Sequence, residues 1–153
     1  MSKQCEICKA PINPKFSLCF DCKESRKFPD PLKIKDTFYN NNKTLKEDVF
    51  LDLPERTARL FAQGGMGMNK LRAFFCMVRN AYDLLNLDRS LSLENIKPQL
   101  WALQRAVEDR TRRGVTPKSF REFINFYLQI ALKNKEELYG FVELFRSVIA
   151  YSK

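Results

Sequence analysis

Apolar side chains repeat every three to four positions through residues 55–153, a spacing that places them on one face of an α-helix. The clearest repeat runs over 69–86, and its apolar face would consist of Leu71, Phe74, Phe75, Val78, Tyr82 and Leu85. Polar and charged residues fill the other positions, as expected for helices that bury one side. The pattern predicts helices over 55–63, 69–86, 95–113 and 117–131, and a last helix from 134 onward.

Short polar and proline motifs indicate where these helices begin. Pro98 fits the first turn of its helix, where the missing N–H breaks no helical hydrogen bond. Thr116 followed by Pro117 predicts an N-cap and a first helical residue. Asn134 with Glu137 three residues later resembles a capping box, in which each side chain bonds the other residue's backbone N–H.

Short connections between amphipathic helices, without alternating strand patterns, predict an all-α fold with a bundle of about five helices over 55–153. Most of the 13 Phe should form its core, because packing explains their helical spacing. Cys76, beside two Phe, is expected to be a small buried apolar residue. Residues 31–54 contain a stretch rich in Pro, Asn and Lys with no sustained period, so we expect a linker there.

Four cysteines are concentrated in residues 1–30, which we call the four-cysteine segment, in two C-x-x-C pairs ten residues apart. Thiolates at this spacing are typical of tetrahedral zinc, so this segment is expected to be a zinc finger or knuckle with four cysteine ligands. Two disulfides, a redox C-x-x-C and an iron–sulfur cluster are the alternatives, but the sequence shows no signal for an oxidising compartment, no strand–helix context and no redox partner motif. The expected Zn²⁺ ligands are Cys5, Cys8, Cys19 and Cys22.

The sequence contains no His, which excludes a Ser-His-Asp triad, a Cys-His pair and a catalytic zinc with imidazole ligands. Four thiolate ligands leave no coordination position for water, so the zinc would be structural. The stretch GGMGMNK at 64–70 lacks the spacing of a phosphate loop. Neighbouring carboxylates at 108–109 and 136–137 fit a solvated helix surface. We therefore do not expect an enzyme.

The chain carries 27 Lys and Arg against 18 Asp and Glu, and this net charge of +9 favours a polyanionic partner such as nucleic acid. Three cations share the polar face of the 69–86 helix: Lys70, Arg72 and Arg79. Five more surround the turn after the 95–113 helix: Arg110, Arg112, Arg113, Lys118 and Arg121. Binding to phosphates is the use that such groups favour. Ordinary surface ion pairs with Glu108, Asp109 and Glu122 are the alternative.

Membrane insertion is not expected. No apolar run approaches the roughly 20 residues that a bilayer-spanning helix needs. The first residues, MSKQC, lack the apolar stretch of a signal peptide. We expect a cytoplasmic protein that has no membrane partner.

Three stretches of the sequence resemble the small helical subunit (Csm2-type, Cas11-like) of type III-A CRISPR-Cas Csm effector complexes. They are GMNKLRAFFCMVRNAYDLL at 67–85, ALQRAVEDRTRRGVTPKSFREFINF at 102–126 and FVELFRSVIAYSK at 141–153. The first resembles a helix opened by a basic residue after a short polar turn. The second resembles a helix that ends in a basic turn, and the third resembles a closing helix with an Ala-Tyr step.

This resemblance implies a non-catalytic subunit that stacks in more than one copy along the effector filament in antiviral defence. Its partners would be CRISPR RNA, target RNA and other Csm subunits, namely the backbone nuclease subunit and the large polymerase-type subunit. The RNA duplex would be bound through its backbone, without sequence specificity. By position, the RNA-facing residues would be Lys70, Arg72, Arg79, Arg110, Arg112, Arg113 and Lys118.

The four-cysteine segment is not part of the common pattern of this family, and its role is open. It would dock on a neighbouring subunit, cap the bundle, or extend the RNA surface through Lys9, Lys15, Lys23, Arg26 and Lys27. Outside this family, the alternative is a zinc-finger DNA-binding or transcriptional adaptor protein. Such a protein needs a polar recognition helix or a finger helix, and neither is evident in the sequence.

Overall fold

The computed structural model of the protein describes residues 3–153, and the predicted all-α fold is confirmed. The N-terminal segment contains a short helix, α1 (Phe20–Lys23), and a two-stranded antiparallel sheet of β1 (Lys3–Gln4) and β2 (Pro11–Ile12). Two 3-10 helices follow, at Asp30–Leu32 and Glu47–Val49. The bundle has the predicted five helices: α2 (Leu53–Gln63), α3 (Met68–Leu87), α4 (Leu93–Arg112), α5 (Lys118–Ala131) and α6 (Lys135–Tyr151).

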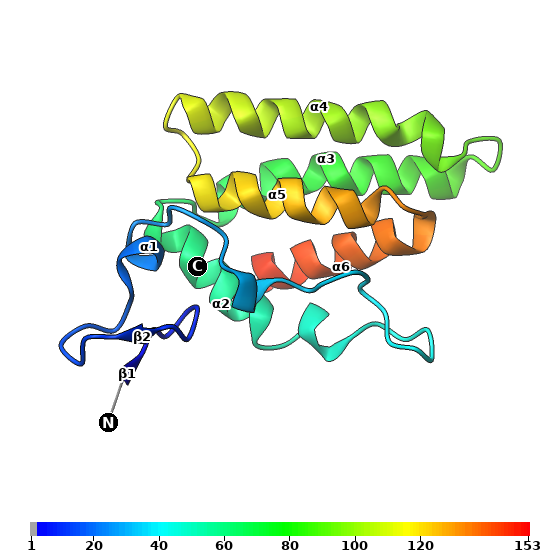
Figure 1. The fold of residues 1–153 in the computed structure, drawn as a ribbon. Helices are drawn as coiled ribbons and strands as arrows, with labels where there is room; N and C mark the ends of the chain where they lie inside the picture. Colours follow the sequence, from blue (N-terminus) through cyan, green and yellow to red (C-terminus); the bar gives the residue numbers. More distant parts are fainter. Residues whose placement is uncertain (1–2) are drawn as a thin grey trace.

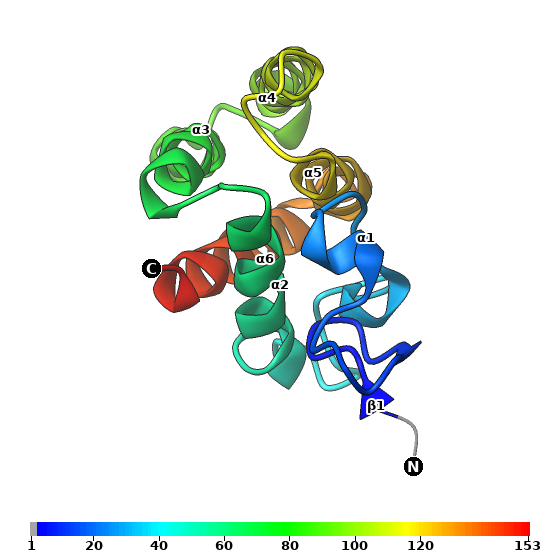
Figure 2. The same cartoon turned by 90° about the vertical axis from the view of Figure 1, so that its left-hand side faces the viewer.

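Helices α3 to α6 form a four-helix arrangement in which α3 packs on α4, α4 on α5, α5 on α6 and α6 on α3. Helix α2 packs against α6, as the end-on view in Figure 2 shows. The α4–α5 turn and α1 lie at one end of the bundle, and the α3–α4 turn lies at the other end (Figure 1). Elements that are far apart in the sequence therefore meet at the end that carries α1.

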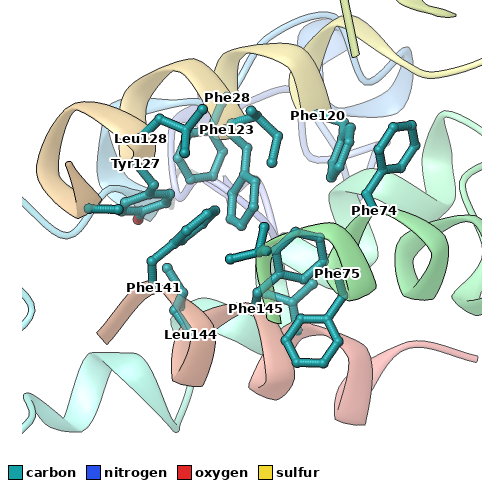
Figure 3. Packing of buried hydrophobic residues seen from close by; sticks show 14 of the residues in the cluster. Phe28, Phe74, Phe75, Phe120, Phe123, Tyr127, Leu128, Phe141, Leu144 and Phe145 are labelled. Carbon is teal, nitrogen blue, oxygen red and sulfur yellow. The ribbon is translucent and has the colours of Figure 1, made fainter. Parts of the chain in front are cut away.

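Aromatic rings fill the centre of this arrangement (Figure 3). Nine of the 13 Phe are buried, which confirms that they are mainly core residues. Phe123 of α5 is central, with its ring centroid 5.2 Å from that of Phe61 and 5.8 Å from that of Phe145. Edge-to-face pairs of this kind stabilise a core beyond the apolar area that they bury.

The start of α6 confirms one half of the predicted capping box. The Asn134 side-chain oxygen accepts a hydrogen bond from the Glu137 backbone N–H at 2.8 Å. The Glu137 carboxylate does not return to Asn134. It accepts instead from the Thr37 hydroxyl at 2.9 Å and from the Phe38 backbone N–H at 3.1 Å. Glu137 thus ties the chain before the bundle to α6.

The starts of two other helices differ from the prediction. Helix α4 begins two residues earlier than predicted, because the Ser92 backbone N–H donates to the Asn95 side-chain oxygen at 2.7 Å and caps it there. Pro98 is therefore in the second turn, not the first. Thr116 does not cap α5, since its hydroxyl lies 2.8 Å from that of Thr111 and closes the preceding turn. Pro117 takes the N-cap position instead.

Residues 31–54, expected to be a linker, lie against the bundle and bury Leu32, Ile34, Phe38 and Val49. The Ile34 backbone N–H donates to the Tyr127 hydroxyl at 2.9 Å. Irregular backbone buries side chains one at a time, so no period in the sequence reveals them. The division into ranges 1–30, 31–54 and 55–153 stays a prediction.

Cys76 is exposed on α3, so the prediction that it is buried was wrong. Phe74, Phe75 and Val78 define the buried face of that helix, and Cys76 lies about 100° beyond Phe75, on the solvent side. Within the described residues, no helix is both long enough and apolar enough to cross a bilayer.

Candidate metal centre and nucleic-acid interface

The four cysteines predicted as metal ligands come together at one point of the N-terminal segment. Their Sγ atoms all lie within 4.8 Å of one another. A tetrahedral zinc ion with Zn–S bonds of about 2.3 Å needs sulfur atoms about 3.8 Å apart. The Sγ atoms of Cys8 and Cys19 are 3.7 Å apart, whereas a disulfide needs about 2.05 Å. The cluster fits one metal ion held by four thiolates.

Each C-x-x-C pair is shaped by its own turn. After the first pair, the Lys9 backbone N–H donates to the Cys5 carbonyl at 2.9 Å, and Lys9 adopts a left-handed backbone with φ 66°. In the second pair, Cys19 caps α1 and its sulfur accepts from the Cys22 backbone N–H at 3.4 Å. The β1–β2 ladder supports the first turn, because its two strands lie on either side of that turn.

Three of the four thiols are buried, and Cys19 is half-buried. Burial raises the pKa of the Cys8 and Cys22 thiols. At Cys5 burial also acts to raise the pKa, but hydrogen bonds from backbone N–H groups, first that of Cys19, outweigh it and lower the pKa to about 6. Buried thiolates need a cation beside them, which a bound metal ion supplies.

The four-cysteine segment is docked on the bundle by polar contacts to α2 and α5. The Arg59 guanidinium lies 2.7 Å from the Glu6 carboxylate and lowers the pKa of that carboxyl. Arg56 donates to the Ile7 carbonyl at 3.0 Å. On the α5 side, the Phe28 backbone N–H donates to the Glu122 carboxylate at 3.3 Å. The orientation of the segment relative to the helices is therefore fixed.

The turn between α4 and α5 is closed by a Schellman motif. The Gly114 backbone N–H donates to the Thr111 carbonyl at 3.0 Å, and the Val115 N–H donates to the Arg110 carbonyl at 2.8 Å. Gly114 has φ +76°, a left-handed conformation that side chains disfavour. This tight stop leaves the cations at the end of α4 exposed at the end of the bundle that also carries α1 (Figure 1).

Three neighbouring depressions lie around this turn and share lining residues, and we call the three together the basic channel. The first has a volume of about 430 Å³ and meets the second at Thr116. The second meets the third at Met77 and Arg110. Three acidic residues also line the channel: Glu24, Glu108 and Asp109. They are outnumbered by its cations, which are Arg26, Lys70, Arg105, Arg110, Arg112 and Lys118.

Four of the cations predicted to bind RNA thus line the basic channel: Lys70, Arg110, Arg112 and Lys118. Lys70 donates to the Val115 carbonyl at 3.3 Å, which joins α3 to the turn. The Arg110 guanidinium lies over the Phe74 ring, 5.4 Å from its centroid. Cations from three helices therefore meet at one end of the bundle.

The other predicted cations lie outside the channel. Arg113 pairs with Asp109, a residue of the channel lining, at 3.5 Å, as Arg112 does at 3.6 Å. Arg121 is half-buried and faces Glu108 at 3.6 Å. The predicted alternative of surface ion pairs is therefore present for Glu108 and Asp109. Glu122 instead serves the docked four-cysteine segment.

Arg72 and Arg79 lie on a different flank of α3 from Lys70, although the three residues were expected to share one face. At about 100° per residue, Arg72 is about 200° around the helix from Lys70, and Arg79 lies close to the direction of Arg72. Both are exposed, and Arg79 pairs with Asp83 at 3.5 Å. They form a second basic patch, separate from the channel.

Sequence reasoning did not identify Arg105 as a channel residue. The sequence does contain a signal for Arg105: it precedes Arg112 by seven residues, so the two side chains fall on one face of α4. Arg26 was noted only as one cation of the four-cysteine segment. Its position beside Lys118 depends on the docking of that segment, which no local pattern reveals.

Comparison with known proteins shows the family to which this chain belongs. No curated protein and no solved structure matches the chain. The family model described as Csm2 Type III-A matches residues 44–153, which include α2 to α6 and the basic turn. The match leaves out the cysteine cluster, in agreement with a metal-binding segment added to a common bundle. The chain therefore belongs to the Csm2 family, the small subunit of type III-A Csm complexes.

Proposed function

We propose that this Csm2 protein is a non-catalytic subunit that binds the backbone of the duplex between CRISPR RNA and target RNA. It acts in the cytoplasm, in antiviral defence, beside the backbone nuclease subunit and the large polymerase-type subunit. Copies of the chain stack along the effector filament. Binding is independent of base sequence, since cations that contact phosphates do not read base edges.

The basic channel is the observation that carries this proposal. Its six cations come from the four-cysteine segment, α3, α4 and α5, so their relative positions are set by the fold. A set of several charges suits a polyanion with regularly spaced phosphates better than it suits a small anion. Arg113, which is exposed at the end of α4, and the second patch of Arg72 and Arg79 extend the positive surface available to RNA.

We further propose that the cysteine cluster holds one structural Zn²⁺. Zinc is the ion that four thiolates in tetrahedral geometry select, and four protein ligands leave no position for a reacting water. The ion would fix the two C-x-x-C turns relative to each other. By holding this part of the chain in place, the ion would also support the contacts that Arg56 and Arg59 of α2 make with Ile7 and Glu6.

The alternative of a zinc-finger DNA-binding or transcriptional adaptor protein receives no support from the geometry. A finger helix must reach several base pairs along a groove. Helix α1, the helix that the cysteines adjoin, has four residues, and its first residue is an exposed Phe. The cations lie instead along the channel.

Fluorescence anisotropy with labelled RNA duplexes tests the proposal. Two duplexes of equal length and unrelated sequence should bind the purified chain with the same affinity. If four channel cations each contact one phosphate, the logarithm of affinity should fall against the logarithm of salt with a slope of about −3 to −4. A strong preference for one sequence, or affinity unchanged by salt, would refute backbone binding.

A further inference from the structure

The first depression of the basic channel lies between the four-cysteine segment and the bundle, which contact each other at its floor. The Ser119 backbone N–H donates to the Ser25 carbonyl at 3.2 Å. Gly64, at the end of α2, allows α2 to approach both the start of α5 and the four-cysteine segment. A Cβ on Gly64 would lie 2.5 Å from the Cβ of Pro117 and 2.9 Å from that of Ser25. The depression is thus part of the folded structure.

Phe20 lines this depression, and most of its large apolar side chain is not covered by the protein. Its side chain is 64% exposed. The Arg26 guanidinium lies over the ring, 5.2 Å from its centroid. Neither Arg26 nor Lys118, which lines the same depression, forms an ion pair within residues 3–153. The site therefore offers a guanidinium plane backed by an aromatic ring, and beside it a second cation, Lys118.

Proteins hold unpaired nucleotides with these groups. A base stacks on an exposed aromatic ring or a guanidinium plane, and nearby cations contact the phosphates on either side of it. A base pair inside a duplex cannot use such a platform, because its faces are covered by its neighbours. The ligand chemistry that fits the depression is therefore a single-stranded nucleotide.

We infer that the four-cysteine segment holds an unpaired nucleotide of an RNA strand, with its base stacked on the guanidinium plane of Arg26, which the Phe20 ring supports, and its phosphate contacted by Lys118. This inference rests on the proposed function, because the strand would reach the depression from the duplex along the channel. It gives the four-cysteine segment a role of its own: the segment extends the RNA surface of the bundle and marks where the duplex ends.

Two observations favour RNA over a neighbouring protein as the occupant. The depression shares Thr116 with the second depression of the basic channel, so the two lie on either side of the same residue. One acidic residue, Glu24, lines it against two cations, Arg26 and Lys118. A second, more apolar depression also has Phe20 in its lining, together with Ile12, Phe16 and Leu18. A protein partner would be expected there instead.

The test uses the full chain with its metal bound and labelled RNA duplexes that share one sequence. One duplex is blunt, one has a short single-stranded overhang, and one has the same overhang without bases. The overhang with bases should bind about 5-fold more tightly than the abasic overhang, the lower end of what one stacked base contributes. Phe20→Ala should abolish this difference and leave blunt-duplex affinity unchanged.

Phe16→Ala is the matched control, since Phe16 is 56% exposed on the same segment but does not line the depression. It should keep the full gain from the bases. Equal affinity for the two overhangs, or a gain that persists in Phe20→Ala, would overturn the inference. So would loss of co-purifying Csm subunits in Phe20→Ala with RNA affinity intact. Failure of the proposed function is distinct, because the blunt duplex would then bind weakly and independently of salt.

Discussion

The hydroxyl oxygens of Ser25, in the four-cysteine segment, and Ser119, in α5, lie 2.6 Å apart and are buried. The Ser25 hydroxyl also donates its one proton to the Leu60 carbonyl of α2, at 2.7 Å. Ser119 must then be the donor to Ser25, because a hydroxyl carries a single proton. One side chain thus joins the four-cysteine segment to two helices of the bundle.

Ser25→Ala should therefore lower the free energy of unfolding by about 1–3 kcal/mol, because the Leu60 carbonyl and the Ser119 hydroxyl lose their partner while buried. Denaturant unfolding followed by circular dichroism measures this change. Ser17→Ala is the control: Ser17 is exposed in the same segment, and its replacement should change stability by less than about 0.5 kcal/mol. Equal effects of the two variants would contradict the docking role of Ser25.

Metal removal should loosen the four-cysteine segment while α3 to α6 stay folded. Protein purified without added metal should contain about one zinc ion per chain by elemental analysis, as four thiolate ligands imply. After chelation, amide hydrogen exchange should rise through residues 3–28 and in α2, which contacts the segment through Arg56 and Arg59. Unchanged exchange in the metal-free chain would show that the cysteines do not hold the segment together.

Gly140→Ala should destabilise the protein, although Ala favours helices over Gly. A Cβ on Gly140 would lie 2.6 Å from the Cβ of Phe38, so the buried segment before α2 would have to move away from α6. A cost of about 1–3 kcal/mol is typical of overpacking in a core. Gly67→Ala is the control, since the nearest atom to its Cβ would be 3.9 Å away. A stabilising Gly140→Ala would refute tight packing of that segment.

Asp109→Asn should strengthen RNA binding. Asp109 pairs with both Arg112 and Arg113, so its neutralisation frees two guanidinium groups and removes a negative charge from the channel. We expect the affinity for RNA to increase about 2- to 5-fold at low salt, which corresponds to the free energy of one exposed ion pair. Glu94→Gln is the control, because it frees Lys97 near the other end of α4. Weaker RNA binding by Asp109→Asn would contradict the proposed channel.

The sequence predicts the parts of this protein that depend on local spacing. The apolar repeat around Phe74 and Val78 predicts α3 because a helix places such residues on one face. The two C-x-x-C pairs likewise predict the thiol cluster, since each pair brings its own sulfur atoms together.

Features that depend on contacts between distant residues could not be predicted. Phe38 and Ile34 are buried without any period, because irregular backbone follows the surface of α5 and α6. The pairing of Arg26 with Lys118 in one depression depends on how the four-cysteine segment docks. The prediction that Cys76 is buried relied on the adjacent Phe residues. The rotation of about 100° per residue in a helix instead places Cys76 on the solvent side of α3.

Charge reversal within the channel tests the central claim most directly. The double variant Arg110→Glu with Lys118→Glu should reduce association of target RNA with the reconstituted Csm complex about 10-fold or more at low salt, since two phosphate contacts become repulsive. Arg89→Glu, at the opposite end of the bundle in the α3–α4 turn, should have little effect. The double variant Arg72→Glu with Arg79→Glu tests the second basic patch, and we expect it to reduce RNA association less than the channel variant does. Unchanged RNA association in the channel variant, with the fold intact by circular dichroism, would contradict the proposed function.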